Sequence, residues 1–431
     1  MDPSVVDALR SAEGRALLTD ATAHDNDAHG RAAAGDARAI DPLKAASSLR
    51  RAHPGANPSL VSAALSQVRM RRRARPRLGD IVDSLLMTDD GSEQATRTVA
   101  AELRAVRYLG SGATHVADLG CGIGLDSIAF ARMGLTVTAV ESDPWTAALA
   151  AANVEELGLA DRVRVIVGEV TDDTVLATVL ASADAVFVDP ARRDPASRNE
   201  GRSARVTDPE SWSPRWSWVA GVAARVPRTA AKVAPGMPHE LTPVGGCATW
   251  TSVDGDLVEA EFAWPAMDSA GNNSVRRRAL IVRKGEPTSL TSTIDLLDQA
   301  PPPVGDIGSW LLEPDDAVIR SGLVSDLAAL LGGRLLDPRV AYITTDTDPG
   351  PGPGPLAAHF RVELALPLHI GRLRDALRER GVGRVVIKKR AIGQDPDDIR
   401  RVLALPPGPH TAVVLITRIG DDPWAFVCDI R

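Results

Sequence analysis

The feature that most constrains the fold is a short glycine-rich stretch, VADLGCGIGLDS, at residues 116–127. Its three glycines, Gly120, Gly122 and Gly124, alternate with other residues between a run of β-formers and a run typical of a helix. Glycine at such positions permits a tight turn from strand to helix and lets a ligand lie against bare backbone. Because any strand-to-helix turn can contain glycine, this glycine turn (residues 120–124) alone does not identify the ligand.

Two acidic residues narrow the choice of ligand. Asp118 precedes the glycines, and Glu141 follows 23 residues after it, at the end of the next β-rich run. An acid at the second position can accept hydrogen bonds from both hydroxyls of a ribose. An acid at the glycine turn favours a ligand with an ammonium or a sulfonium over a diphosphate. The alternative is that the glycine turn belongs to an NAD-type dehydrogenase.

The region 96–285 shows short β-rich runs that alternate with helical stretches. The runs are HVADLG, LTVTAVES, RVRVIVGE, DAVFVDP and AAKVAP. Such alternation predicts an α/β domain in which helices cover a parallel sheet. Ser92 is placed to cap a helix that leads into the first strand.

Helical and mixed regions flank this domain. Residues 1–95 form a helical region, because apolar residues recur at spacings of three and four. A Pro-rich linker spans residues 286–310. Residues 311–431 are expected to form a separate α+β domain, with the pattern strand, helix, strand, helix, strand, strand towards its end. The helices predicted outside the central domain are Val5 to Leu18, Asp41 to Arg51, Pro58 to Arg73 and Asp315 to Leu331.

Composition excludes several classes of protein. No apolar run approaches the roughly 20 residues that cross a bilayer, and the first residues lack the pattern of a secretory signal, so we expect a cytoplasmic protein. The cysteines Cys121, Cys247 and Cys428 are far apart, which predicts reduced thiols and no metal site.

Positive charge is clustered although the net charge is −7, with 49 Lys and Arg residues against 56 Asp and Glu residues. The clusters are RMRRRARPR (Arg69 to Arg77), RRR (Arg276 to Arg278) and IKKR (Ile387 to Arg390). Basic patches on an acidic protein suit a polyanionic partner, and they equally suit a solvated surface.

The order and spacing of four segments resemble the class I S-adenosylmethionine-dependent methyltransferases. VADLGCGIG resembles their first motif, Glu141 the ribose-binding acid of the second, VIVGEV the third, and VFVDPARR the fourth. The resemblance implies a Rossmann-like, mostly parallel sheet of seven strands, with S-adenosylmethionine as the cofactor. The cofactor-binding residues that it implies are Asp118, Gly120, Gly122, Gly124, Glu141, Ser142, Glu169 and Val170.

A narrower resemblance covers nearly the whole chain. The stretches DGSEQATR, WSPRWSWV, KVAPGMPHEL, WLLEPDDAVIRSGL and GVGRVVIKKR resemble the bacterial methyltransferase family, common in actinobacteria, that carries a C-terminal THUMP-like domain. THUMP domains bind RNA in tRNA-modifying enzymes, so the resemblance implies an RNA substrate, either tRNA or rRNA.

The fourth motif brings Asp189 and Pro190 to the end of a strand, where ligands meet parallel sheets. Many nucleic-acid amino-methyltransferases have Asn/Asp-Pro-Pro and an aromatic there, whereas this chain continues with Ala191 and Arg192. A base could stack instead on an arginine or on one of the tryptophans of WSPRWSW, namely Trp212, Trp216 and Trp218.

The stretch DPAR also resembles the DPPR of uracil-C5 RNA methyltransferases, which need a cysteine nucleophile shortly afterwards. Here AAKVAPG lacks a cysteine, and Cys247 lies 58 residues beyond Asp189. This favours direct in-line methyl transfer to nitrogen or oxygen. Asp189 is the catalytic carboxylate, which orients the substrate or accepts its proton, and His239 is a secondary candidate base.

The remaining substrate-binding predictions concern basic residues. Arg192 and Arg193 are placed to hold a phosphate near the pocket mouth, and the Arg69–Arg77 cluster to grip an RNA backbone together with Lys388, Lys389 and Arg390 of the C-terminal domain. In the alternative, Asp189 caps a turn and the arginines pair with nearby acids. Two other functions stay open: a methyltransferase for a small molecule or protein, whose C-terminal domain is a lid or dimer interface, and a cofactor-binding protein without turnover.

Overall fold

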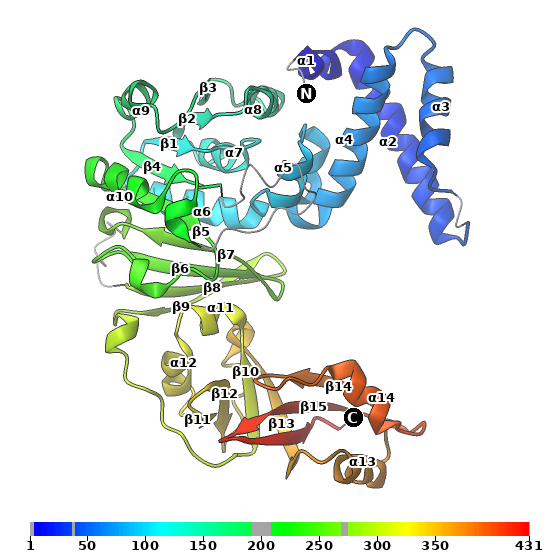
Figure 1. The fold of residues 1–431 in the computed structure, drawn as a ribbon, viewed down its shortest axis with the longest axis vertical. Helices are drawn as coiled ribbons and strands as arrows, with labels where there is room; N and C mark the ends of the chain where they lie inside the picture. Colours follow the sequence, from blue (N-terminus) through cyan, green and yellow to red (C-terminus); the bar gives the residue numbers. More distant parts are fainter. Residues whose placement is uncertain (1–3, 37–38, 192–207, 269–274, 431) are drawn as a thin grey trace. The chain divides into compact units, whose positions relative to one another are not determined.

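The chain forms two compact units in a computed structural model that describes residues 4–36, 39–191, 208–268 and 275–430 (Figure 1). The first unit comprises Met1–Val233 and Ala263–Asn273. The second comprises Ala234–Phe262 and Ser274–Arg431. No helix of the residues described is both long and apolar enough to cross a membrane.

The sheet of the first unit contains five parallel strands in the order β3-β2-β1-β4-β5. Every residue of β4 is buried, as expected of a central strand that helices cover on both faces. The five predicted strands are therefore confirmed. Their bounds are β1 (His115–Leu119), β2 (Thr136–Glu141), β3 (Val163–Val167), β4 (Ala185–Val188) and β5 (Thr229–Val233).

Helices pack on this sheet, and an aromatic cluster lies beneath them. The ring centroids of Tyr108 and Phe130 are 4.8 Å apart, and Phe187 of β4 meets both rings edge-on. The hydroxyl of Tyr108 donates to the carbonyl of Val186 at 2.7 Å, which ties a helix to the central strand. The helices are α6 (Thr98–Gly110), α7 (Leu125–Arg132), α8 (Pro144–Glu156), α9 (Asp173–Leu180) and α10 (Trp216–Arg225), with short turns η3 (Pro209–Ser211) and η5 (Pro265–Asp268).

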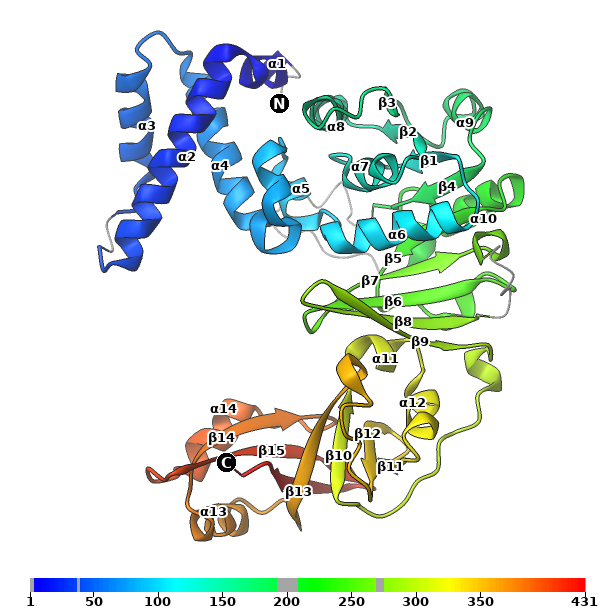
Figure 2. The same cartoon turned by 180° about the vertical axis from the view of Figure 1, so that it is seen from behind.

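The N-terminal region is helical, as predicted, and Figures 1 and 2 show α3 lying beside α2. The predicted single helix from Val5 to Leu18 was wrong, because the chain breaks at Ser11, whose hydroxyl accepts from the Gly14 amide and starts a new helix. The elements are α1 (Ser4–Arg10), α2 (Ala12–Ala33), α3 (Pro42–Ala52), α4 (Pro58–Leu78), η1 (Gly79–Ser84) and α5 (Asp89–Gln94).

The predicted capping role of Ser92 was also wrong. Thr88 is the capping residue of α5, where its hydroxyl accepts from the Gly91 amide at 2.8 Å. Ser92 lies inside α5 and is fully buried, and α6 starts separately at Thr98.

The second unit begins with four strands in the order β7-β6-β8-β9. β6 and β8 are parallel, and β8 and β9 are antiparallel. The expected alternation of strands with helices does not continue here, because β6 leads through a turn into β7, and β8 through a turn into β9. Their bounds are β6 (Cys247–Val253), β7 (Asp256–Ala263), β8 (Arg277–Arg283) and β9 (Glu286–Ser292), with η4 (His239–Leu241) before them and η6 (Leu296–Asp298) after.

The rest of the second unit is an α+β structure, as predicted, around a seven-stranded sheet in the order β11-β12-β10-β13-β16-β15-β14. β14 and β15 are parallel and the other pairs are antiparallel. The predicted final pattern corresponds to β13 (Ala357–Pro367), α13 (Ile370–Glu379), β14 (Val382–Lys389), α14 (Pro396–Leu403), β15 (His410–Ile419) and β16 (Asp422–Cys428).

The predicted helix from Asp315 to Leu331 was wrong in extent. It is two short helices, α11 (Asp316–Arg320) and α12 (Val324–Leu330), separated at Gly322, whose φ of +69° no helix accommodates. Three strands around it were not predicted. They are β10 (Trp310–Pro314), β11 (Arg334–Asp337) and β12 (Val340–Thr345), and the turn η7 (Gly354–Leu356) follows them.

Candidate active site

The glycine turn connects β1 to α7, and glycine is favoured for a different physical reason at each of two positions. Gly120 has φ of +89°, and a Cβ there would lie 3.1 Å from the carbonyl oxygen of Asp189, so a side chain would push against the end of β4. Gly122 has φ of +56°, and nothing lies within 4 Å of where its Cβ would be. The turn therefore presents bare backbone to open space, as a bound ligand requires.

Glu141 holds this turn in place from the end of β2. Its Oε2 accepts from the Gly122 amide at 3.0 Å, and its Oε1 accepts from the Asp143 amide at 2.9 Å and from the Ser142 hydroxyl at 3.4 Å. Glu141 is half-buried and Ser142 is exposed. A fixed, partly accessible carboxylate beside open backbone suits the hydroxyls of a ribose.

Asp118, at the start of the turn, has no exposed surface. Its Oδ2 accepts from the Ser127 hydroxyl at 2.5 Å, and its Oδ1 is buried without a hydrogen-bond partner among the residues described. Burial, together with the charges of Asp126 and Asp189, raises the pKa of this carboxyl group from 3.8 to about 7. A negative charge here acts on a ligand through a low-dielectric interior, so it favours a ligand that carries positive charge.

The third motif lies beside the second. The Gly168 amide, after β3, donates to the Glu141 carbonyl at 3.0 Å, and Val167 is 55% exposed. Glu169 is exposed and accepts from the Thr171 hydroxyl at 3.4 Å, whereas Val170 is buried. The residues predicted to face the cofactor thus follow the adjacent strands β1, β2 and β3. The open glycine turn, the carboxylates and the exposed Val167 together fit a nucleoside that carries positive charge.

Asp189 follows β4 and forms an ion pair with the Nζ of Lys232 in β5. The register pairs Val188 with Ala231, so the next residue of each strand meets its counterpart. Lys232 is 7% exposed and Asp189 is 28% exposed. The acid is therefore the partner that a substrate can reach, while Pro190 behind it is buried.

The lysine belongs to a longer chain of polar contacts. Its Nζ donates to the Thr96 hydroxyl at 3.0 Å, and that hydroxyl donates to the Asp126 Oδ2 at 2.8 Å. The other oxygen of Asp126 pairs with Arg104, whose guanidinium lies 4.5 Å from the centre of the Phe187 ring. The network fixes Lys232, and through it the carboxylate of Asp189.

Sequence reasoning missed Lys232, Thr96, Asp126 and Arg104 as site residues. Lys232 leaves one signal, since it is the charged residue inside the otherwise apolar stretch AAKVAP. Thr96 leaves none, because it lies 136 residues from the lysine that it binds.

The tryptophans that were predicted to stack on a base are buried or half-buried. Trp212 is 4% exposed, so it offers no open ring face in this structure. Trp216 packs against Trp264 with ring centroids 5.6 Å apart, and Trp218 is half-buried. The backbone of Ser213 pairs with that of Ala191, which places this segment next to the end of β4. Arg192 and Arg193 lie outside the residues that the structure describes.

His239, the secondary candidate base, belongs to the second unit. Its Nε2 lies 2.8 Å from the carbonyl oxygen of Arg320, and its ring stacks on Trp250 at 4.5 Å. Burial lowers its pKa. These contacts engage both the ring face and the Nε2 of His239.

Most of the N-terminal basic cluster on α4 is paired within the first unit. Arg72 pairs with Asp25 at 2.5 Å, Arg73 with Asp89 and Glu93, and Arg75 with Asp80 and Asp83. Arg77 donates to the backbone carbonyls of residues 92 and 93. The cluster therefore offers fewer open charges to RNA than its sequence indicates.

The basic clusters of the second unit are also largely engaged. Arg277 donates to the carbonyls of Ile294 and Gly322. Lys388 pairs with Glu313 at 2.5 Å, and Arg390 with Asp316 at 3.6 Å. Lys389 is exposed and forms no ion pair with the residues described.

Two family models match parts of the chain: a THUMP domain-like family matches residues 357–429, and an RNA cap guanine-N2 methyltransferase family matches residues 113–195. A Mycobacterium tuberculosis protein described as an uncharacterized S-adenosylmethionine-dependent methyltransferase is 32% identical over 380 residues, which cover 83% of this chain and 94% of the relative. The chain belongs to the S-adenosylmethionine-dependent methyltransferases. The predicted family and cofactor are thus confirmed.

Two further comparisons extend this. A Porphyromonas gingivalis crystal structure described as that of a methyltransferase superposes with a TM-score of 0.66, covering 88% of this methyltransferase and 92% of that chain at 18% identity, which supports the predicted fold class. A 23S rRNA (uracil(1939)-C(5))-methyltransferase of Acidithiobacillus ferrooxidans is 38% identical over 79 residues, 18% of each chain.

The methyltransferase shows no cluster for a metal within the ranges described, where no three His, Cys, Asp or Glu residues are grouped to hold an ion. Its three cysteines are free and buried, and burial raises the pKa of the Cys121 and Cys428 thiols well above the usual value.

Proposed function

We propose that this enzyme transfers the methyl group of S-adenosylmethionine to a nitrogen or oxygen of tRNA or rRNA by direct in-line displacement. The observation that carries the proposal is the pair of Asp189 and Lys232 at the carboxyl ends of β4 and β5, with the Asp189 carbonyl 3.1 Å from the Cβ position of Gly120 in the cofactor turn. An acceptor atom held by this acid lies close to the cofactor, which is what in-line transfer requires.

Each residue of the site has one role in this mechanism. The bound cofactor supplies an electrophilic methyl group on a positively charged sulfonium. Asp189 accepts a hydrogen bond from the N–H or O–H of the acceptor, which orients its lone pair, and can take the proton as the bond to carbon forms. Lys232 balances the charge of that carboxylate and fixes its position from the buried side. Glu141 and the glycine turn hold the nucleoside part of the cofactor.

Nitrogen or oxygen is favoured over carbon because β5 provides no nucleophile for a pyrimidine ring. The uracil-C5 enzymes that the DPAR stretch resembles need a cysteine thiolate. The β5 segment contains no cysteine, and Cys121, in the glycine turn, is buried with a raised pKa, which disfavours its thiolate.

RNA is favoured over other substrates by three similarities. The families matched over residues 357–429 and 113–195 are described by a THUMP domain and by RNA cap methylation, and one short match is to an rRNA methyltransferase. The exposed Lys389, near the C-terminal end of β14, offers a positive charge to a phosphate backbone.

The test is to incubate the enzyme and labelled cofactor with total RNA from a strain that lacks its gene, and to identify the modified nucleoside by mass spectrometry. We expect one N- or O-methylated nucleoside that Asp189→Asn does not produce. Label incorporated into protein or metabolite extracts but not into RNA would refute the RNA substrate, and a C5-methylated pyrimidine would refute the displacement mechanism.

A further inference from the structure

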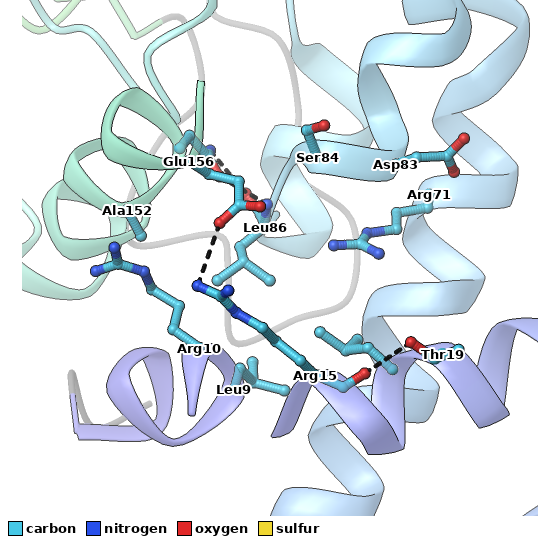
Figure 3. Close-up of a pocket in the computed structure, with 12 residues that line it drawn as sticks. Leu9, Arg10, Arg15, Thr19, Arg71, Asp83, Ser84, Leu86, Ala152 and Glu156 are labelled. Carbon is cyan, nitrogen blue, oxygen red and sulfur yellow. Dashed lines mark hydrogen bonds and ion pairs between the residues drawn. The ribbon is translucent and has the colours of Figure 1, made fainter. Parts of the chain in front are cut away.

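A cavity of about 250 Å³ lies in the first unit, where α1, α2, α4 and η1 meet α8 (Figure 3). Leucines and an alanine form part of its wall, and the rest is polar. The polar side chains that matter here are Arg10, Arg15, Arg71, Asp83, Ser84 and Glu156. None of these residues belongs to the cofactor turn or to the Asp189 site.

The carboxylates of the cavity wall already have arginine partners. Glu156 pairs with Arg15 at 3.6 Å, which Figure 3 marks, and Asp83 pairs with Arg75. Arg10 reaches Glu155 at 2.5 Å. These acids are therefore engaged by arginines other than Arg71, with Arg75 shared between Asp80 and Asp83.

Arg71 differs from the other arginines of the wall. Its Nε donates to the Leu85 carbonyl at 2.9 Å, and among the residues described it forms no other hydrogen bond and no ion pair. Figure 3 shows the guanidinium extending from α4 towards Leu86. Burial lowers its pKa, with Asp83 and Glu156 acting in the opposite direction, yet a guanidinium stays protonated near neutral pH.

The guanidinium of Arg71 is half-buried, and its unpaired terminal nitrogens keep some exposure, so an anion can reach them. Taking a charge out of water is unfavourable without a partner, and the two terminal nitrogens of arginine match the oxygens of a phosphate in a bidentate contact. The Ser84 hydroxyl on the same wall can donate one more hydrogen bond. The apolar part of the wall leaves room for a sugar attached to the phosphate.

We propose that this cavity binds a phosphate group through the guanidinium of Arg71. The phosphate can belong to a free nucleotide or to an RNA backbone, and only the second source rests on the proposed function. The site would then be an anchor for a phosphorylated ligand on the N-terminal helices, separate from the acid that faces the reacting atom.

The test is calorimetric titration of the full-length enzyme with inorganic phosphate at constant ionic strength, with chloride as the reference anion. Arg71→Gln should raise the Kd for phosphate at least about tenfold, because it removes a charge-assisted bidentate contact. Arg69→Gln is the matched control, since Arg69 is an exposed arginine of the same helix whose terminal nitrogen contacts Ser66 outside the cavity. Equal phosphate binding in wild type and Arg71→Gln would overturn the proposal.

A second variant covers the case in which Arg71→Gln does not fold. Ser84→Asp leaves Arg71 and its bond to Leu85 in place but adds a carboxylate to the cavity, so it should also abolish phosphate binding; unchanged binding would overturn the proposal. Competition with a short oligoribonucleotide and with a mononucleotide separates the two phosphate sources. Because the readout is binding of phosphate, a failure of RNA methylation would leave this result unaffected.

Discussion

Lys232 and Asp189 form an ion pair across β4 and β5 in which the lysine is 7% exposed and the aspartate 28% exposed. The two partners are therefore unequally buried, and the lysine has more need of its counter-ion than the aspartate has. The carboxylate can reach water or a substrate, whereas the ammonium has Thr96 and Asp189 around it within the first unit. The pair combines a buried ammonium with a carboxylate on the accessible side.

The first prediction concerns catalysis by Asp189. Asp189→Asn should reduce methyl transfer about 100-fold or more, because it removes the group that orients and deprotonates the acceptor. Cofactor binding, measured by calorimetry, should stay within about twofold of wild type, because the cofactor turn is untouched. An unchanged transfer rate would remove Asp189 from the chemistry.

The second prediction concerns the stability of the same pair. Asp189→Asn leaves a buried ammonium without its counter-ion and should lower the free energy of unfolding by about 2–4 kcal/mol, whereas Lys232→Met leaves an acid that water can solvate and should cost about 1 kcal/mol or less. Urea denaturation of both variants provides the comparison. A larger loss for Lys232→Met would contradict the assignment of Lys232 as the buried partner.

The sequence was sufficient to place the residues that we expect to bind the cofactor at one edge of the sheet. β1 to β5 are short apolar runs separated by helices, and parallel strands bring their carboxyl ends to one edge, so Gly122, Glu141 and Asp189 could be placed from spacing and motif resemblance. The contact between Lys232 and Thr96 could not, because it joins segments that are remote in sequence and that only the folded packing brings together.

Charge patterns were less informative than motif spacing. The sequence shows that Arg72, Arg73 and Arg75 are clustered, but their partners include Asp25, far along the chain, and acids in the following turns. A helix that packs on other helices neutralises such a cluster, which composition cannot distinguish from an open basic face. The helical break at Ser11 was missed because the apolar residues keep their helical spacing across it.

The third prediction concerns Glu141, which supports the glycine turn and which we expect to bind the ribose. Glu141→Gln should raise the Kd for S-adenosylmethionine about 10- to 100-fold, since an amide retains only one acceptor oxygen for contacts that a carboxylate makes with two. Calorimetry measures the effect. Glu102→Gln is the control, because Glu102 is an exposed acid of α6 that lies outside the predicted cofactor site and should change the Kd little. Wild-type affinity in Glu141→Gln would contradict the ribose contact.

The fourth prediction follows from the pKa of Asp118, which burial raises from 3.8 to about 7. Between these values the unfolded chain releases the proton while the folded protein keeps it, so the free energy of unfolding falls as pH rises from about 4 to about 7. Asp118→Asn should lack this part of the pH dependence, whereas Asp161→Asn, at an exposed position, should keep it. Urea denaturation at pH 5 and pH 7.5 tests the difference, and parallel profiles for wild type and Asp118→Asn would contradict the raised pKa.

The last prediction separates the basic residues of β14 and rests on the proposed RNA substrate. Lys388 pairs with Glu313 at 2.5 Å and lies 5.8 Å from the centre of the Phe360 ring, so its charge is already balanced within the second unit. Lys389 is exposed without an ion pair among the residues described, so it is the residue of this pair that can release a counter-ion from a phosphate backbone.

Lys389→Ala should therefore weaken tRNA binding by about three- to tenfold at low salt and reduce the slope of log K against log salt by about one. Lys388→Ala should affect stability more than RNA binding. Lys44→Ala, which removes an exposed lysine from α3, controls for the change in net charge. Filter binding at several salt concentrations measures all three, and equal losses for Lys389→Ala and Lys44→Ala would show that only net charge, not this strand, attracts the RNA.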